Sequence, residues 1–414
     1  MSNPLRLFEG YGVELEYMIV DQSTLDVRPI ADQLLAGKAG EQVSDLEDGA
    51  IGWSNELVLH VLEFKTNGPA TRLEELPREF TRAVADANEI AKGIGARLMP
   101  TAMHPWMDPL RETQLWPHDY SPVYAAFDNI FGCSGHGWSN LQSTHLNLPF
   151  AGDDEFGRLH AAIRAVLPLL PALAASSPLV EERNTGIADN RLAFYRTNAK
   201  RIPSVTGAVV PEPVFTREVY ERDLLGGLYR DIAPFDPDGL LQEEWLNARG
   251  AIARFDRMAI EIRVLDVQEC PSADLAIVAL TTAVVKALCE DRWVGQDELR
   301  RLDTTALSEA FTSTSLAAGS SRVELADWLR VFGLSKPLSA VDLWTYLLEQ
   351  TSTDEAEDPL RPTGPLRPFA DRILREGCLS KRITNRLPGD PERGAIREVY
   401  EELCDCLAQD RMLP

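Results

Sequence analysis

Alternating apolar and polar residues predict several β-strands in the first two thirds of the chain. In these segments every second side chain is apolar, which is the period of a strand with one buried face. Polar stretches separate them, without the regular strand–helix–strand units that build a parallel sheet. The predicted strands cover 12–20, 56–66, 97–101, 143–148 and 259–267.

Apolar residues spaced three and four positions apart predict helices between and after these strands. One helix is expected from residue 73 to the glycine pair Gly93 and Gly95, and another over 154–175, interrupted near Pro168 and Pro171. The chain after residue 270 has this period almost throughout, apart from breaks at 333–337 and 358–368.

Two segments lack either period. Residues 103–140 are rich in Pro, Gly, His and Trp and include the turn-prone run 132–137, which predicts a long functional loop or lid. Residues 176–213 predict another irregular polar stretch. We therefore expect an α+β fold in which helices pack against an antiparallel or mixed sheet, rather than a doubly wound parallel sheet.

Length and composition set the scale of the protein. The chain has 414 residues, of which 44% are hydrophobic and 25% charged, as in ordinary globular proteins. We interpret 1–414 as a single catalytic domain, with a sheet-bearing core over 1–270 and a helical portion over 271–414. For the helical portion we expect packing, and a homo-oligomer interface is a further candidate role.

The charge balance narrows the partners. Lys and Arg number 41 and Asp and Glu 64, so the formal net charge is −23. Nucleic-acid binding draws on a surplus of basic residues, so we expect no nucleic-acid partner. The totals do not say whether the acids cover a solvated surface or gather in a cation site, so their positions must decide.

Neither a secretory signal nor a membrane span is expected. The N-terminal residues lack a basic start with an apolar stretch, and the most apolar run, 275–288, is interrupted by Lys286 and predicts a buried helix. We expect a cytoplasmic protein without a membrane partner. Six cysteines are too few for a disulfide framework, and Cys404 and Cys406 would not share one face of a helix, so packing is favoured over a metal pair.

Three predicted strands place polar side chains together on one face. In the first, Glu14 and Glu16 share the face opposite Val13 and Leu15. Adjacent carboxylates repel, so either a cation or bulk water must compensate them, and an ordinary half-exposed strand remains an alternative. The other two strands pair Glu261 with Arg263, which also suits a surface ion pair, and His145 with Asn147.

Glu56 and Glu63 present a problem of spacing. They are seven residues apart, so an uninterrupted strand would place them on opposite faces, and only a bulge or turn would bring them together.

The candidate residues favour oxygen-loving metal ions. No phosphate-binding glycine loop and no zinc-type Cys and His spacing occurs in the sequence. Glutamate oxygens suit Mg²⁺ or Mn²⁺, and Mg²⁺ commonly binds through a few carboxylates together with nucleotide phosphates. The residues alone thus predict a carboxylate-bound magnesium nucleotide on a sheet face.

Short motifs in a fixed order point to a family. They are Gly12-Val13-Glu14-Leu15-Glu16, Glu56 with Glu63-Phe64-Lys65-Thr66-Asn67, Thr144-His145-Leu146-Asn147, Ala175-Ser176-Ser177-Pro178, Thr185-Gly186, Tyr195-Arg196, Pro211-Glu212-Pro213 and Ile260-Glu261-Ile262-Arg263-Val264-Leu265-Asp266. This set resembles glutamate-cysteine ligase family 2, bacterial carboxylate-amine ligases of the glutamine-synthetase-like superfamily. The resemblance covers the first 270 residues or so.

The resemblance implies a saddle-shaped, mostly antiparallel sheet with helices on its outer face and with ATP and Mg²⁺ on its concave face. It also implies that Glu56 and Glu63 meet at the metals. Arg263 would contact the terminal phosphate as a cofactor-binding and catalytic residue, together with Glu261. The implied metal ligands are Glu14, Glu16, Glu56, Glu63, His145 and Glu261.

The implied activity is ATP-dependent ligation of a carboxylate to an amine through an acyl phosphate. Glutamate and cysteine are the default pair, giving γ-glutamylcysteine. A ligase with another amine or carboxylate and a non-catalytic nucleotide- or metal-binding regulatory protein are the alternatives. The candidate substrate-binding residues are Arg191, Arg196, Arg201 and Asn147, and Arg196 is also a candidate for the nucleotide.

Overall fold

A computed structural model describes residues 4–414 and is built around one eight-stranded antiparallel sheet. The strand order is β2-β3-β4-β1-β6-β10-β9, with β5 paired to the far end of β1. The α+β fold and the mostly antiparallel sheet are thereby confirmed. The strands are β1 (Gly12–Asp21), β2 (Asp45–Asp48), β3 (Ile51–Asn55), β4 (Val61–Thr66), β5 (Ala96–Met99), β6 (Ser143–Pro149), β9 (Ala251–Arg254) and β10 (Ala259–Asp266).

One of the predicted strands was wrong in its form. The sequence predicts a single strand over 56–66, whereas the structure has a β3–β4 hairpin whose turn spans 56–60. Glu56 therefore directly follows β3, and Glu63 lies within β4. The other four predicted strands agree with β1, β5, β6 and β10 to within a few residues.

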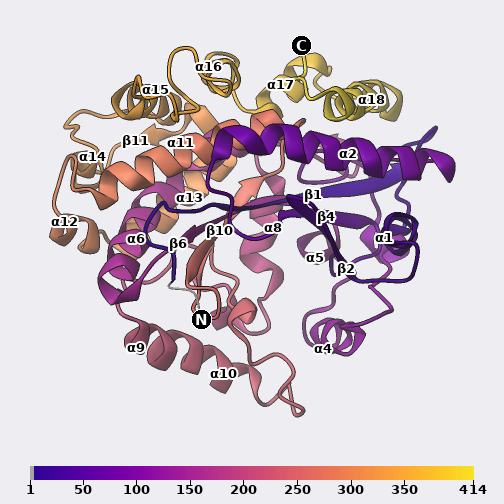
Figure 1. Ribbon diagram of the computed structural model, residues 1–414, viewed down its shortest axis with the longest axis horizontal. Coiled ribbons are helices and arrows are strands. Elements are labelled where there is room, and N and C mark those ends of the chain that lie inside the picture. The colour runs from indigo at the N-terminus through magenta and orange to yellow at the C-terminus, as the bar shows by residue number, and fades with distance from the viewer. Residues whose placement is uncertain (1–3) are drawn as a thin grey trace.

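Long helices cover the apolar face of the sheet. Val13, Leu15 and Tyr17 of β1 are fully buried in a core shared with α2 (Leu76–Gly93), α6 (Gly152–Val166) and α11 (Pro271–Cys289). Figure 1 shows α2 and α11 on one side of the strands and α4 (Ser121–Phe131), α5 (His136–Ser139) and α8 (Asn190–Asn198) on the other. The alternation of β1 thus has the consequence expected of it, because the face opposite Glu14 and Glu16 is apolar and packed.

Helix α11 is the one described helix with the length and composition to cross a membrane. Its apolar window is 89% buried inside the protein. Packing against α2, α6, α15 (Ala340–Thr351) and α16 (Arg367–Glu376) accounts for this hydrophobicity.

Two segments expected to be irregular contain helices, of which α4, α5 and α8 contribute side chains to the polar side of the sheet. The first holds α3 (Pro109–Glu112), α4 (Ser121–Phe131) and α5 (His136–Ser139), and the second holds α8 (Asn190–Asn198). In α4, Val123, Phe127 and Phe131 lie four residues apart and form one face of the helix. This helix was not predicted because its short periodic stretch lies within a segment rich in Pro and Gly.

The remaining elements fill the periphery and the C-terminal third, which is helical as predicted. The interruption predicted at 333–337 lies between α14 (Ala326–Val331) and α15, and the one predicted at 358–368 lies between α15 and α16 except for its last two residues, which begin α16. These elements are α1 (Ala31–Ala39), α7 (Pro171–Ala174), α9 (Arg217–Val219), α10 (Gly226–Ile232), α12 (Gln296–Arg300), α13 (Thr304–Ala317), α14 (Ala326–Val331), α15 (Ala340–Thr351), α16 (Arg367–Glu376), α17 (Leu379–Arg386), α18 (Arg393–Gln409), and the small ribbons β7 (Leu179–Val180) with β8 (Arg183–Asn184) and β11 (Arg322–Val323) with β12 (Leu338–Ser339).

Helices α17 and α18 cover the far end of β1. Met18 and Val20 follow Glu14 and Glu16 in the alternation of the strand, yet they are buried in a second apolar cluster with Ile396, Tyr400 and Leu403. Cys404 and Cys406 are free and are buried in the same cluster, which agrees with the packing role expected for them. The C-terminal helices therefore limit how far the polar face extends along β1.

We expect Leu403→Ala to lower the free energy of unfolding by about 2–5 kcal/mol, because it opens a cavity under α18. Leu403 is fully buried. The matched control is Glu398→Ala on the exposed face of the same helix, for which we expect a change within about 0.5 kcal/mol. Urea unfolding followed by circular dichroism checks both, and equal midpoints for the two variants would contradict the packing role of α18.

Candidate active site

The register of four neighbouring strands, β4, β1, β6 and β10, gathers the predicted acids. In β1, Glu14 lies opposite His145 of β6, and Glu16 lies opposite Glu63 of β4. On the other edge of β6, Asn147 lies opposite Glu261 of β10. Residues opposite one another in an antiparallel pair point to the same face, so these side chains share one surface.

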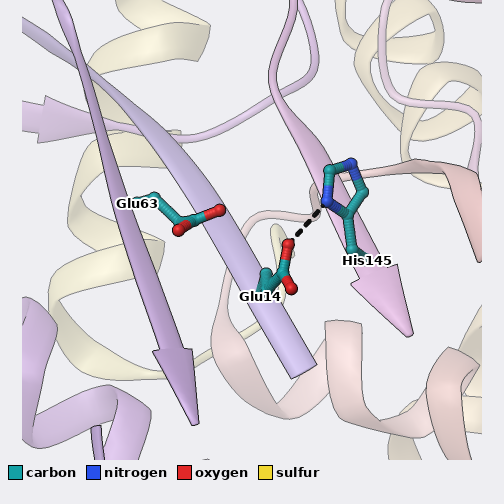
Figure 2. Close-up of side chains that lie close together, drawn as sticks. All are labelled: Glu14, Glu63 and His145. Carbon is teal, nitrogen blue, oxygen red and sulfur yellow. Dashed lines mark hydrogen bonds and ion pairs between the residues drawn. The ribbon is translucent and has the colours of Figure 1, made fainter. Parts of the chain in front are cut away.

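His145 lies at the centre of this surface and touches both acids of β1. Its Nδ1 is 2.8 Å from Glu14 Oε2, and its Nε2 is 2.9 Å from Ser143 Oγ and 3.7 Å from Glu16 Oε1. Figure 2 shows Glu14, Glu63 and His145 converging from β1, β4 and β6. The Ser143 backbone N–H also donates to Glu16 Oε2 at 2.8 Å, which fixes that carboxylate.

Two sets of side chains have the spacing of cation ligands, and Glu63 belongs to both. In each set the ligand atoms lie within 4.8 Å of one another. One set is Glu14, Glu63 and His145, and the other is Glu16, Glu56 and Glu63. Glu56 reaches the second set because it leaves β3 at the hairpin turn, so the turn resolves the problem of its spacing from Glu63.

The charges of these groups perturb one another strongly. Burial and then the charge of Glu14 raise the pKa of Glu63 to about 7. Burial and then the charges of Glu16 and Glu63 raise the pKa of Glu56 well above its usual value. The cluster therefore does not hold all of its negative charge unless positive charge is added.

His145 supplies part of that positive charge. Burial alone would lower its pKa, but the hydrogen bond to Glu14 and the charges of Glu16 and Glu14 outweigh burial and raise it to about 9. Burial alone would raise the pKa of Glu14, yet its bond to His145 brings it to about 2. An imidazolium thus neutralises Glu14, whereas Lys65 and Ser54 compensate Glu63 only in part, and Glu56 has no basic partner among the described residues.

The residues present fit divalent cations that prefer oxygen ligands. Four glutamates and one histidine surround two adjoining positions, and Asn147 Oδ1 finds no hydrogen-bond partner within residues 4–414. Mg²⁺ and Mn²⁺ prefer carboxylate and carbonyl oxygens, which the four glutamates and the amide of Asn147 supply.

Glu261 lies at the basic side of the cluster. Its Oε1 is 2.9 Å from Arg263 Nη2, and its Oε2 accepts from Arg254 Nη1 at 3.3 Å. The register of β10 with β6 shifts between Ile262 and Leu265, next to Arg263. The predicted pair of Glu261 and Arg263 is therefore formed on the polar face, and Arg254 of β9 extends it.

Of the arginines proposed for substrate, only Arg191 lines the cleft. Its Nε donates to the buried Asp266, while its Nη2 finds no partner in the part of the chain that the structure describes. The buried Tyr195 hydroxyl also lines the cleft and lacks a described partner. An unsatisfied guanidinium N–H beside a hydroxyl is suited to receive a carboxylate.

The structure does not bring Arg196 and Arg201 to this cleft. Both are exposed, and Arg201 Nη1 donates to the backbone carbonyls of Asn129 and Ile130 at the end of α4. Arg196 follows Arg191 on α8, and Arg201 lies beyond the end of this helix. Their side chains are directed away from the cleft that Arg191 lines.

Two clefts meet over the acids. The larger, of about 670 Å³, has the acids and arginines as its floor and aromatic residues of α4, α5 and Trp245 as a wall. The smaller, of about 490 Å³, lies toward the start of β1 and includes Asn147, Gly12 and Gly52. Glu14, Lys65 and Arg257 line both clefts.

Sequence reasoning missed several residues of this site. Ser143 and Lys65 could have been found, because alternation places them on the faces of His145 and Glu63. Lys65 Nζ is 2.6 Å from Asp45 and 3.5 Å from Glu63. Arg254, Tyr124 and Trp245 gave no such signal, because they reach the cleft through pairings between distant segments.

Comparison with known proteins agrees with the geometry. The model of a family described as "Glutamate-cysteine ligase family 2(GCS2)" matches residues 11–402. An "Uncharacterized protein" of Archaeoglobus fulgidus is 31% identical over 403 residues, covering 97% of this chain and 99% of that protein. A "Putative glutamate--cysteine ligase 2-3" of Paenarthrobacter aurescens is 30% identical over 284 residues, covering 68% of this chain and 58% of the relative.

Two solved structures share the fold at low sequence identity. The crystal structure of glutamate–cysteine ligase from Francisella tularensis in complex with AMP has a TM-score of 0.61 and 11% identity, covering 98% of this chain and 90% of that one. A bifunctional glutathione synthetase from Pasteurella multocida has a TM-score of 0.51 and 13% identity, covering 98% of this chain and 52% of that one.

We expect Mg²⁺ to bind more tightly as the pH rises from about 6 to about 8. Because the pKa of Glu63 is raised to about 7, a proton occupies its carboxyl in acid and must leave when a cation binds. Isothermal titration calorimetry in buffers of different ionisation enthalpy measures this release. Glu63→Gln is the control, for which we expect weaker binding and less proton release.

The same shift sets the pH dependence of stability. The pKa of Glu63 in the fold exceeds its ordinary value of 4.5, so its contribution stabilises the cation-free protein below about pH 4.5 and is lost as the pH rises through about 7. Mg²⁺ should therefore raise the melting temperature more at about pH 8 than at about pH 6. Equal increments at the two pH values would contradict this assignment.

Proposed function

This chain belongs to glutamate-cysteine ligase family 2, and from that premise we propose that it is an ATP-dependent ligase that joins a carboxylate to an amine through an acyl phosphate. The observation that carries the proposal is the pair of acidic ligand sets sharing Glu63, beside the ion pair of Glu261 and Arg263. Carboxylate-held cations next to an arginine are suited to the charge of a triphosphate.

In this proposal the glutamates hold cations and do not act as general acids or bases in the reaction. Glu14, Glu63 and His145, once the imidazolium has lost its proton, would hold one cation, and Glu16, Glu56 and Glu63 a second. Glu261 is the further ligand that we propose. When bound, Mg²⁺ supplies charge neutralisation and polarises the phosphoryl oxygens. The fixed hydrogen bonds from Ser143 to Glu16 and from Asn147 to Glu14 keep these carboxylates in place.

The reaction has two steps. A carboxylate oxygen of the acid forms a bond to the γ-phosphorus of ATP, the bond from that phosphorus to the bridging oxygen breaks, and ADP leaves. The amine nitrogen then bonds to the acyl carbon, the bond from carbon to the phosphate oxygen breaks, and phosphate leaves. The ammonium form of the amine yields one proton to solvent and one to the departing phosphate.

Basic side chains of the cleft have separate roles in these steps. Arg263 would stabilise the charge of the transferred phosphoryl group, as arginines do in other phosphoryl transfers, and its partner Glu261 holds its direction. Arg191 Nη2 and the Tyr195 hydroxyl, both without described partners, would bind the second carboxylate of an acidic amino acid. Asp266 positions Arg191 from below.

Glutamate and cysteine are the first substrates to test, because the family is named for that pair. We place the reaction in the cytoplasm, and a homo-oligomer through the helical third stays a prediction.

With purified protein, MgATP and glutamate, we expect ADP release that depends on an added amine. A panel of amines including cysteine, followed by mass spectrometry of the product, identifies the acceptor. A γ-glutamyl amide with one amine supports the ligase. ATP binding without any amine-dependent ADP release would contradict it and would instead favour a regulatory nucleotide-binding protein.

We expect Arg263→Ala and Glu261→Gln each to reduce turnover by at least about a thousandfold, because the phosphoryl charge loses its stabilising partner or that partner loses its orientation. The matched control is Arg230→Ala, an exposed arginine of α10, which should keep wild-type turnover. Thermal unfolding of all three variants checks that the fold is intact. Wild-type turnover in a folded Arg263→Ala or Glu261→Gln variant would remove that residue from the mechanism.

A further inference from the structure

Aromatic side chains form one wall of the larger cleft, next to the carboxylates. The proposed phosphoryl transfer assigns no role to this aromatic wall. The ring of Phe127 in α4 lies 4.9 Å from that of Trp138 in α5 and 6.1 Å from that of Trp245, in a segment more than 100 residues away. All three line the larger cleft, and each is only partly buried, so part of each ring is open to it. Tyr124 and Leu141 continue the wall.

The wall is joined directly to the acidic floor. Asn55 Nδ2 donates to the Tyr124 hydroxyl at 3.0 Å and to the Glu56 carbonyl at 3.0 Å. A molecule lying against Tyr124 and Phe127 is therefore next to Glu56. Aromatic faces attract ammonium groups and apolar rings, and the carboxylates below add further attraction for positive charge.

The wall offers no basic partner for a carboxylate. Among the described residues, those that line the cleft from α4, α5 and 240–245 include Glu243 but no Lys or Arg. Arg254 and Arg263 of the floor face Glu261, and Arg254 Nε, which has no hydrogen-bond partner among the described residues, lies 3.8 Å from Glu244. The open donor of Arg191 serves the acid substrate in the proposed function.

The smaller cleft offers a nucleoside space away from the wall. The smaller cleft shares Glu14, Lys65 and Arg257 with the larger one, so a triphosphate on the acids can extend into it. Its lining includes Gly68, which has no neighbouring atom where a side chain would stand, so the backbone there leaves room for a ligand. The aromatic wall is then left for the second substrate.

We infer that the acceptor is a primary amine carried on an apolar, aromatic body without a carboxylate, an arylalkylamine in class, whose ring lies on Phe127, Trp138 and Trp245. This inference rests on the proposed ligase function and names its second substrate. The amine nitrogen points to the floor near Glu56, where it bonds to the acyl carbon as phosphate leaves. Cysteine is too small to cover the aromatic wall, and its carboxylate would face the acidic residues of the cleft without a basic partner on the wall.

The first experiment compares acceptors with the wild-type chain, MgATP and glutamate. The probes are 2-phenylethylamine, phenylalanine, which adds a carboxylate to the same body, ethylamine, which lacks the ring, and cysteine. We expect kcat/KM for 2-phenylethylamine to exceed the other three by about tenfold or more. A higher kcat/KM with cysteine or phenylalanine overturns the inference and leaves the proposed ligase function intact. If none of the amines stimulates ADP release, both the inference and the ligase function are overturned.

The second experiment places the acceptor on the wall. We expect Trp245→Ala to lower kcat/KM for 2-phenylethylamine about tenfold through KM and to leave the KM for ATP within about twofold of wild type. Trp293→Ala, a tryptophan of the helical third outside the cleft, is the matched control. A rise in the KM for ATP instead would place adenine on the wall and overturn the inference.

Discussion

Repulsion between carboxylates on one face of a sheet is the constraint on which this site depends. Glu14, Glu16, Glu63 and Glu261 point to one surface, and Glu56 joins them from a turn. A few fixed positive charges and hydrogen bonds offset the repulsion between these carboxylates. This compensation is incomplete at Glu56 and Glu63. The incomplete compensation is what gives the protein affinity for cations, so the instability of the empty cluster and its proposed use have the same origin.

A cluster of this kind needs a rigid support. The opposite face of β1 is packed against α2, α6 and α11, so the strands that carry the acids cannot easily move apart. Behind the cleft, Asp266 accepts hydrogen bonds from Ser176, Ser177 and Arg191, and these bonds tie α8 to β10. Apolar packing thus supplies the energy that holds like charges at short distance.

The sequence predicted the parts of the site that depend on a single strand. Alternation correctly gave the shared face of Glu14 with Glu16 and of Glu261 with Arg263, because side-chain direction in a strand follows from local geometry. It failed for Glu56, because a turn changes direction in a way that alternation does not encode. It also missed Arg254 and the aromatic wall, since these come from segments that meet only after folding. The resemblance to a family, and not the spacing, predicted that Glu56 meets Glu63.

Strand β1 does two jobs along one face, and this restricts how the gene can change. Its Glu14 and Glu16 belong to the polar cluster, while Met18 and Val20 on the same face are buried beneath α18. A one-residue insertion or deletion inside the strand would exchange its two faces, sending Val13 or Leu15 into the cluster and carboxylates into the core. Length variation among related chains should therefore spare β1 and gather in connections that carry neither face, such as the exposed segment 353–357 between α15 and α16.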